Sequence, residues 1–251
     1  MKNYEQLNNN DLNIVDNTLV RKNTFLGYTL LWFTFCMVIS FTTAFAATYN
    51  MVTVVNYFVN HYYSWILGGV LTIALLFIYM FLGPKMHLGI SIPIVTIIMM
   101  GFGLFALSVP LYYAKYTLDW WKLYLVLFLP AGFMLIMGTL AATNKINLSM
   151  LWVPLIVLFV AIITLSIVSW FVFSDWLVSL ISGLGVLLMV IYMGIDWLLI
   201  NKFNKVYSDF INTEETKKEM IRMSLFFGFK LAYDYIYCVL YLIRLFSNFK
   251  N

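Results

Sequence analysis

The chain has 251 residues, of which 63% are hydrophobic and only 10% are charged. Soluble domains carry about 25% charged and about 45–50% apolar residues, so the composition excludes a water-soluble fold. The net charge of +4 is small and falls at the ends and in the breaks between apolar stretches, which leaves nucleic-acid binding without support. The two cysteines, Cys36 and Cys238, lie inside apolar stretches and are predicted to be buried free thiols.

The first 23 residues are polar and rich in asparagine, which predicts a cytosolic tail over 1–23. Residues 24–251 form one predicted domain, because no repeat or linker divides them. Seven apolar stretches follow, each near the 20 residues with which a helix crosses a hydrocarbon core of about 30 Å. The predicted fold is therefore all-α, a polytopic membrane protein of about seven transmembrane helices with the last one central. The stretches lie near Phe25–Ala47, Ser64–Gly83, Leu88–Tyr112, Leu123–Ala142, Met150–Phe173, Trp176–Ile200 and Ser224–Phe246.

The segment after Ile200 is the one long, charged break between these stretches. Its apolar residues recur at helical spacing, which predicts a helix lying along the membrane interface and then a solvated turn. Those apolar residues are Phe203, Val206, Tyr207, Phe210 and Ile211.

The distribution of basic residues predicts the orientation. With the N-terminus inside, ten lysines and arginines fall on the inner side and four on the outer side. Seven spans then place the C-terminus outside. A re-entrant hairpin stays open for the seventh stretch, because it contains Lys230, Asp234 and Arg244.

Two carboxylates stand out among the 11 acidic residues. Nine acidic residues lie in the tail, in the breaks or at span edges, whereas Asp196 and Asp234 lie within the sixth and seventh stretches. A charged side chain at the centre of a span costs about 2.5–3.5 kcal/mol on insertion scales, so such residues are candidates for function. The alternative is that each is a neutral, hydrogen-bonded group of the bundle core.

Asp196 and Asp234 can meet, although their expected depths differ by up to about two helical turns. The difference shrinks if the sixth helix continues past Ile200. Two adjacent carboxyl groups in a low-dielectric setting share one proton and titrate as a unit. The pair is therefore a predicted pH sensor.

The last stretch resembles a known family. Residues 231–246 read LAYDYIYCVLYLIRLF, which is similar to the closing signature L-Y-L-D-F-I-N-L-F-L-Y-L-L-R-L-L of the Bax inhibitor-1 family (transmembrane Bax inhibitor motif proteins), bacterial members included. Asp196 also stands where that family's sixth helix ends in aspartate. It is followed by Trp197 rather than the usual threonine, and Tyr237 replaces the usual asparagine. The positions in register are Asp234, Ile236, Leu240, Tyr241, Leu242, Arg244 and Leu245.

The resemblance implies a pH-sensitive calcium leak: a passive pore closed by the last helix and governed by Asp196 and Asp234. These two residues would also form a weak calcium site, with the ion as permeant ligand and no other cofactor. Calcium prefers six to eight oxygens, and a weak site suits conduction. The expected partners are the lipid bilayer and the cation, no protein partner is indicated, and a bacterial plasma membrane is the favoured location. No enzymatic activity is expected.

Lys230 and Arg244 are predicted to modulate the aspartates. Lys230 lies four residues before Asp234, so a helix places both on one face about 6 Å apart. We hypothesise that Lys230 is the counter-ion of Asp234 and replaces a basic residue that some family members carry near the second helix. The alternative is that Lys230 extends to the inner interface and ignores Asp234.

Two other functions use the same aspartates. A proton-coupled transporter could run on the pair, although no broken helices or inverted halves favour one. An intramembrane aspartyl protease needs Tyr-Asp and Gly-x-Gly-Asp motifs on adjacent helices. Tyr233-Asp234 supplies the first motif, but Met193 stands where the second needs a glycine, and the two come in reverse chain order.

Overall fold

The computed structural model describes residues 24–143, 148–172, 174–210 and 214–248, and within them the chain is helical with no strand. The predicted tail, 1–23, lies outside this described part. The elements in chain order are α2 (Thr24–Tyr49), α3 (Met51–Asn60), α4 (Tyr62–Leu82), η1 (Gly83–Lys85), α5 (Leu88–Gly101), η2 (Phe102–Leu107), α6 (Ser108–Thr117), α7 (Trp120–Ala142), α8 (Leu148–Ser169), α9 (Asp175–Phe210) and α10 (Glu214–Asn248).

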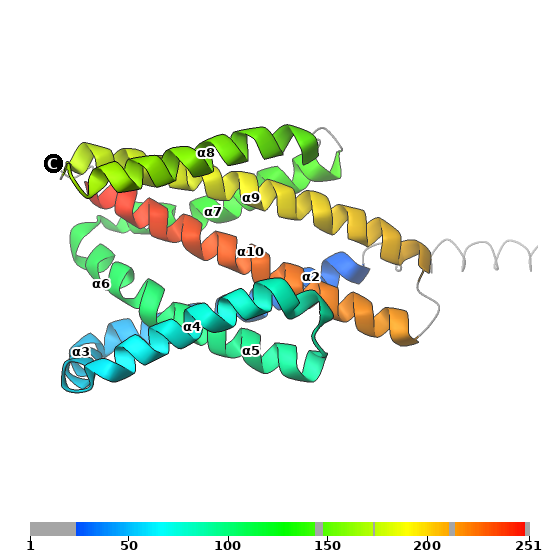
Figure 1. Cartoon of the computed structure of the whole chain (residues 1–251), viewed down its shortest axis with the longest axis horizontal. Helices are drawn as coiled ribbons and strands as arrows, with labels where there is room; N and C mark the ends of the chain where they lie inside the picture. The colour runs from blue at the N-terminus through cyan, green and yellow to red at the C-terminus, as the bar shows by residue number, and fades with distance from the viewer. Residues whose placement is uncertain (1–23, 144–147, 173, 211–213, 249–251) are drawn as a thin grey trace, which may run out of the picture.

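Seven helical segments in the described ranges are long and apolar enough to cross a membrane, which confirms the predicted all-α fold. They are α2, α4 with η1, the continuous run of α5, η2 and α6, and each of α7, α8, α9 and α10. Successive segments run in alternating directions, so the start of α2 and the end of α10 lie at opposite ends of the bundle (Figure 1). The re-entrant alternative for the seventh stretch is wrong, because α10 is one uninterrupted helix of 35 residues.

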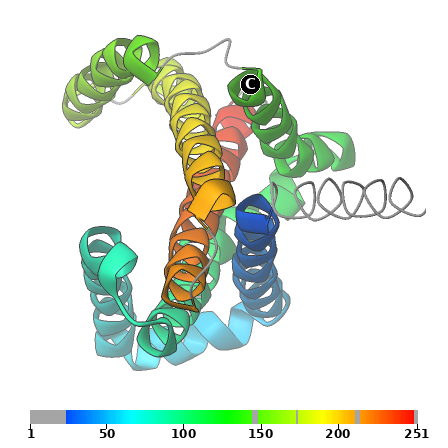
Figure 2. The same ribbon diagram turned by 90° about the vertical axis from the view of Figure 1, so that its right-hand side faces the viewer.

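The last helix occupies the centre of the bundle, as predicted. In α10, 67% of the most apolar window is buried, against 6% in α8 and 17% in α4 with η1. α10 packs against α9, α2, α7 and α6, and the end-on view shows these helices arranged around it (Figure 2). The outer helices α4 and α8 instead expose large apolar side chains, which is the surface that a lipid solvent favours.

The prediction of an interfacial helix after Ile200 is wrong. α9 continues without a break to Phe210, and its extension packs into the bundle rather than along a surface. The rings of Phe203 and Tyr207 lie 6.3 and 5.3 Å from the ring of Phe25 on α2, so aromatic packing directs the extension inward. The predicted turn is also wrong from Glu214 onward, because α10 already begins at that residue. The short, exposed helix α3 was not predicted.

Two glycines set how closely α10 approaches its neighbours. A Cβ at Gly228 would lie only 2.7 Å from the Thr29 carbonyl oxygen and 2.8 Å from the Phe33 nitrogen, both on α2. A Cβ at Gly185 of α9 would lie 2.5 Å from the ring of Tyr241 on α10. Because neither glycine has a side chain, α10 can pack closely against α2 and α9 at these two positions.

Candidate functional site

The structure brings Asp196 and Asp234 together in the middle of the bundle. Asp196 on α9 is fully buried, and Asp234 on α10 is 4% exposed. The two carboxyl groups lie close enough to interact electrostatically. Two neighbouring carboxyl groups can form a hydrogen bond with each other only when one of them carries a proton. When both are ionised, they face each other as like charges in a poorly solvated setting.

Lys230 also lies at this site, but its direct partner differs from the hypothesis. Its ammonium group donates to Oδ1 of Asp196 across the interface between α9 and α10, and the two form an ion pair. Asp234, on the same face of α10 one turn away, interacts with Lys230 electrostatically without forming the pair. The Lys230 side chain is 23% exposed. It therefore does not extend away to the interface, and Asp196, Lys230 and Asp234 form a triad of two buried carboxyl groups and one partly buried ammonium.

Helix register explains why Lys230 meets Asp196. Asp196 lies 14 residues before the end of α9 at Phe210, and Lys230 lies 16 residues after the start of α10 at Glu214. The two helices run in opposite directions on either side of a short connection, so these residues reach nearly the same depth. Asp234 lies one turn deeper, about 6 Å further along α10.

The triad leaves two acceptors without a donor. Oδ2 of Asp196 and Oδ2 of Asp234 are both buried and accept no hydrogen bond from any N–H or hydroxyl in the described residues. Burying such an atom costs about 1–3 kcal/mol, and more for a charged group. A proton shared between the two carboxyl groups lowers this cost, because it removes one of the two negative charges. A bound cation or ligand can do the same.

A cavity of about 400 Å³ adjoins the triad between α4, α8, α9 and α10. Lys230 and Asp234 contribute its polar lining. Four tyrosines surround them: Tyr192, Tyr233, Tyr237 and Tyr241. The sequence analysis did not assign these tyrosines to a cavity, although three of them recur at a spacing of four along α10 and so share one helical face.

Arg244 does not join the triad. It is exposed near the end of α10, ten residues or about 15 Å along the helix from Asp234. Among the described residues, no three His, Cys, Asp or Glu side chains gather as a metal site. A calcium ion at the triad would thus have two carboxylates and no third acidic ligand. Both cysteines are buried and free, as predicted.

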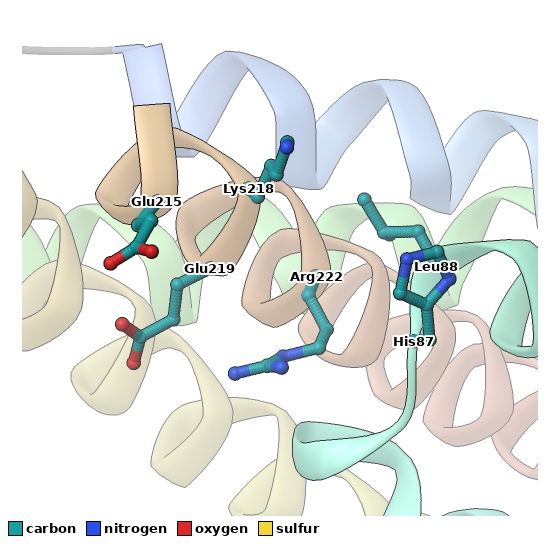
Figure 3. A pocket seen from close by; sticks show the side chains of 6 residues that line it. All are labelled: His87, Leu88, Glu215, Lys218, Glu219 and Arg222. Carbon is teal, nitrogen blue, oxygen red and sulfur yellow. The ribbon is translucent and has the colours of Figure 1, made fainter. Parts of the chain in front are cut away.

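A second cavity, of about 420 Å³, lies at the start of α10, away from the triad (Figure 3). His87 and Leu88 at the start of α5 face the first turns of α10 there, and Figure 3 shows Glu219 and Arg222 extending to one side of α10. The His87 ring caps α5 by accepting a hydrogen bond of 3.2 Å from the Gly89 nitrogen. Two acidic and two basic residues of α10 balance each other in this cavity: Glu215, Glu219, Lys218 and Arg222.

Fold and site together define the class of this chain: it is an integral, multi-pass membrane protein with ionisable groups buried in its helical bundle. No family model and no curated protein matches the chain. The resemblance to the Bax inhibitor-1 family consequently stays an expectation, carried by the residues of the last helix and by Asp196.

Proposed function

We propose that this protein is a passive cation leak of a bacterial plasma membrane, related to the Bax inhibitor-1 family, in which Asp196, Lys230 and Asp234 control passage. The observation that carries the proposal is the triad itself. Three ionisable groups inside an apolar bundle are costly, and such groups in membrane proteins serve ion or proton pathways. Packing alone would favour apolar residues at these positions.

The proposed gate follows from the charge of the triad. With both carboxylates ionised and Lys230 protonated, the triad carries a net charge of −1 and attracts a cation. When the pair takes up a proton, the net charge becomes zero and the attraction is lost. Lowering the pH through the titration of the pair should therefore reduce the flux.

Lys230 gives the proposed leak an internal cation. Its ammonium lies against Asp196, where a passing ion would otherwise bind. Calcium therefore meets two carboxylates whose charge is already half balanced, which makes its binding weak. A weak site suits conduction, since an ion must leave as readily as it enters.

Proton-coupled transport is the second candidate, and the ion pair between Lys230 and Asp196 is the observation that favours it. A lysine that exchanges partners between two carboxylates can link proton uptake to a change in helix packing. A protease is less well supported, because Met193 stands where the Gly-x-Gly-Asp motif needs a glycine and the two motifs come in reverse chain order.

The test uses purified protein in sealed vesicles with a calcium-sensitive dye inside. A leak carries calcium down its gradient only, and an imposed proton gradient adds no accumulation above the outside concentration. Lys230→Met should move the pH midpoint of calcium flux upward, because without the ammonium the two neighbouring carboxyl groups take up a proton more readily. Proton-driven accumulation would select the transporter. The absence of any calcium flux in both the parent chain and Lys230→Met would remove the leak.

A further inference from the structure

The cavity beside the triad has features of a ligand site that a simple ion path does not need. Its volume of about 400 Å³ falls within the range of small-molecule pockets, about 300–1,000 Å³. An inorganic cation needs only a small fraction of this space. Most of its lining is aromatic and aliphatic, with Lys230 and Asp234 as its charged groups.

The two charged groups that line the cavity differ in whether a partner compensates their charge. Lys230 donates to Asp196, so its positive charge is compensated outside the cavity lining. Asp234 is 4% exposed, lines the cavity, and leaves Oδ2 without a donor in the described part of the chain. In the ionised triad, Asp234 is therefore the uncompensated group. A ligand that fits must bring a positive charge and an N–H donor.

The tyrosines fit the same ligand. Tyr233 and Tyr237 lie on the face of α10 that bears Asp234, with ring centroids 4.5 Å apart, and Tyr192 approaches from α9. Tyrosine faces attract cations at about 6 Å or less, which adds to the attraction of the carboxylate. Phe159 and Ile163 of α8 close the cavity on the outer side and would contact an apolar body.

We expect access to the cavity from the bilayer. Phe159 and Ile163 are 49% and 44% exposed, so the α8 wall of the cavity reaches the lipid-facing surface. In Figure 1, α8 and α4 flank α10 on opposite sides, and α4 packs chiefly on α5 while α8 packs on α9. A molecule dissolved in lipid could thus enter between α4 and α8 without crossing the protein core.

From this geometry we infer that the cavity binds a lipophilic organic ammonium ion, with its N–H group on Asp234 and its apolar body between the tyrosines and α8. The inference goes beyond the proposed leak, because binding of such a molecule does not depend on whether an inorganic ion passes. The ligand class is set by one buried acceptor, an aromatic surround and entry from lipid.

The test measures binding to the full chain in zwitterionic lipid nanodiscs by calorimetry, at about pH 8. The probes are 4-phenylbutylamine, the neutral 4-phenylbutanol, and the quaternary 4-phenylbutyltrimethylammonium. We expect the amine to bind at least about tenfold more tightly than the alcohol, and the quaternary ion to fall between them, since it keeps its charge but lacks an N–H donor.

Three variants accompany the probes. Asp234→Asn should weaken amine binding about tenfold or more, whereas Asp175→Asn, an equal change at an exposed position at the start of α9, should leave it unchanged. Ile163→Trp fills the cavity from α8, away from the triad, and should abolish binding even if Asp234→Asn fails to fold. Equal binding of amine and alcohol, or amine binding that Ile163→Trp leaves intact, would overturn the inference.

Discussion

Lys230 is the residue that separates this site from a bare pair of carboxylates. Two buried aspartates alone would hold either one shared proton or two like charges, and neither state attracts and releases a cation smoothly. The ammonium on Asp196 compensates one carboxylate, which leaves Asp234 as the carboxyl group whose charge changes in the proposed gate. The charge of the site then changes between −1 and zero, a small step that suits reversible gating.

A double-mutant cycle should detect this ion pair in the stability of the protein. Asp196→Asn leaves the Lys230 charge without its partner in the bundle, and should lower the free energy of unfolding by about 3 kcal/mol. Asp196→Asn with Lys230→Met should lose less than the two single variants together, with a coupling of about 1–3 kcal/mol. Unfolding in detergent, followed by circular dichroism, gives these values.

The ion pair of Asp119 and Lys122 is the matched control. Its atoms lie 3.3 Å apart, but the Asp119 side chain is 59% exposed, so the same cycle should give a coupling below about 1 kcal/mol. If the coupling free energy of Asp196 and Lys230 is no larger than that of this control, the ion pair in the bundle stabilises the protein no more than an exposed one.

At the scale of the helices, the position of α10 depends on its close contact with α2. Gly228→Ala would place a methyl group 2.7 Å from the Thr29 carbonyl oxygen, where backbone must shift to make room. Overpacking of this kind costs about 1–3 kcal/mol. We expect a lower unfolding temperature in detergent and, because α10 carries Asp234, an altered pH dependence of flux.

Gly183→Ala on α9 serves as the comparison, since nothing lies within 4 Å of a Cβ at that position. Alanine favours the helix there by about 0.5–1 kcal/mol, so the variant should be as stable as the parent chain or more so. A Gly228→Ala variant that matches Gly183→Ala in unfolding temperature would show that α10 is not held as described.

The helix boundaries show how far the sequence predicts the site. Hydropathy locates all seven spans, because an uncharged run of about twenty apolar residues is typical of a transmembrane helix. It misplaces the ends of α9 and α10, since charged residues beyond Ile200 look like an interfacial segment. The stacking of Phe203 and Tyr207 on Phe25 is a tertiary contact without a local signal. Because the ends of α9 and α10 were misplaced, the sequence did not reveal that Asp196 and Lys230 lie at nearly the same depth. The spacing of four residues along α10 therefore predicted Asp234, rather than Asp196, as the partner of Lys230.

The whole molecule has a buried centre and apolar outer walls. α10 and much of α9 form a buried centre that contains every member of the triad, whereas α4 and α8 form apolar outer walls. The tyrosine-lined cavity lies where centre and wall meet. The cavity therefore places Lys230 and Asp234 beside the outer helices α4 and α8.

The seven spans predict that the two ends of α10 lie on opposite sides of the membrane. Single cysteines at Lys217, near the start of α10, and at Asn251, the last residue, can be probed with an impermeant label in intact vesicles. Cys36 and Cys238 are fully buried and should not react. We expect Lys217→Cys to be labelled only from the inner side and Asn251→Cys only from the outer side. Labelling of both from one side would refute seven spans.

The most direct test of the proposed gate is the pH dependence of cation flux in vesicles that contain the Asp234→Asn variant. Asparagine cannot ionise, so the triad is held at the net charge it has when protonated. We predict that flux in the parent chain falls as the pH is lowered, that Asp234→Asn stays at the low level at every pH, and that Asp175→Asn follows the parent chain. An Asp234→Asn variant with the parental flux and the parental pH profile would contradict a gate controlled by the triad.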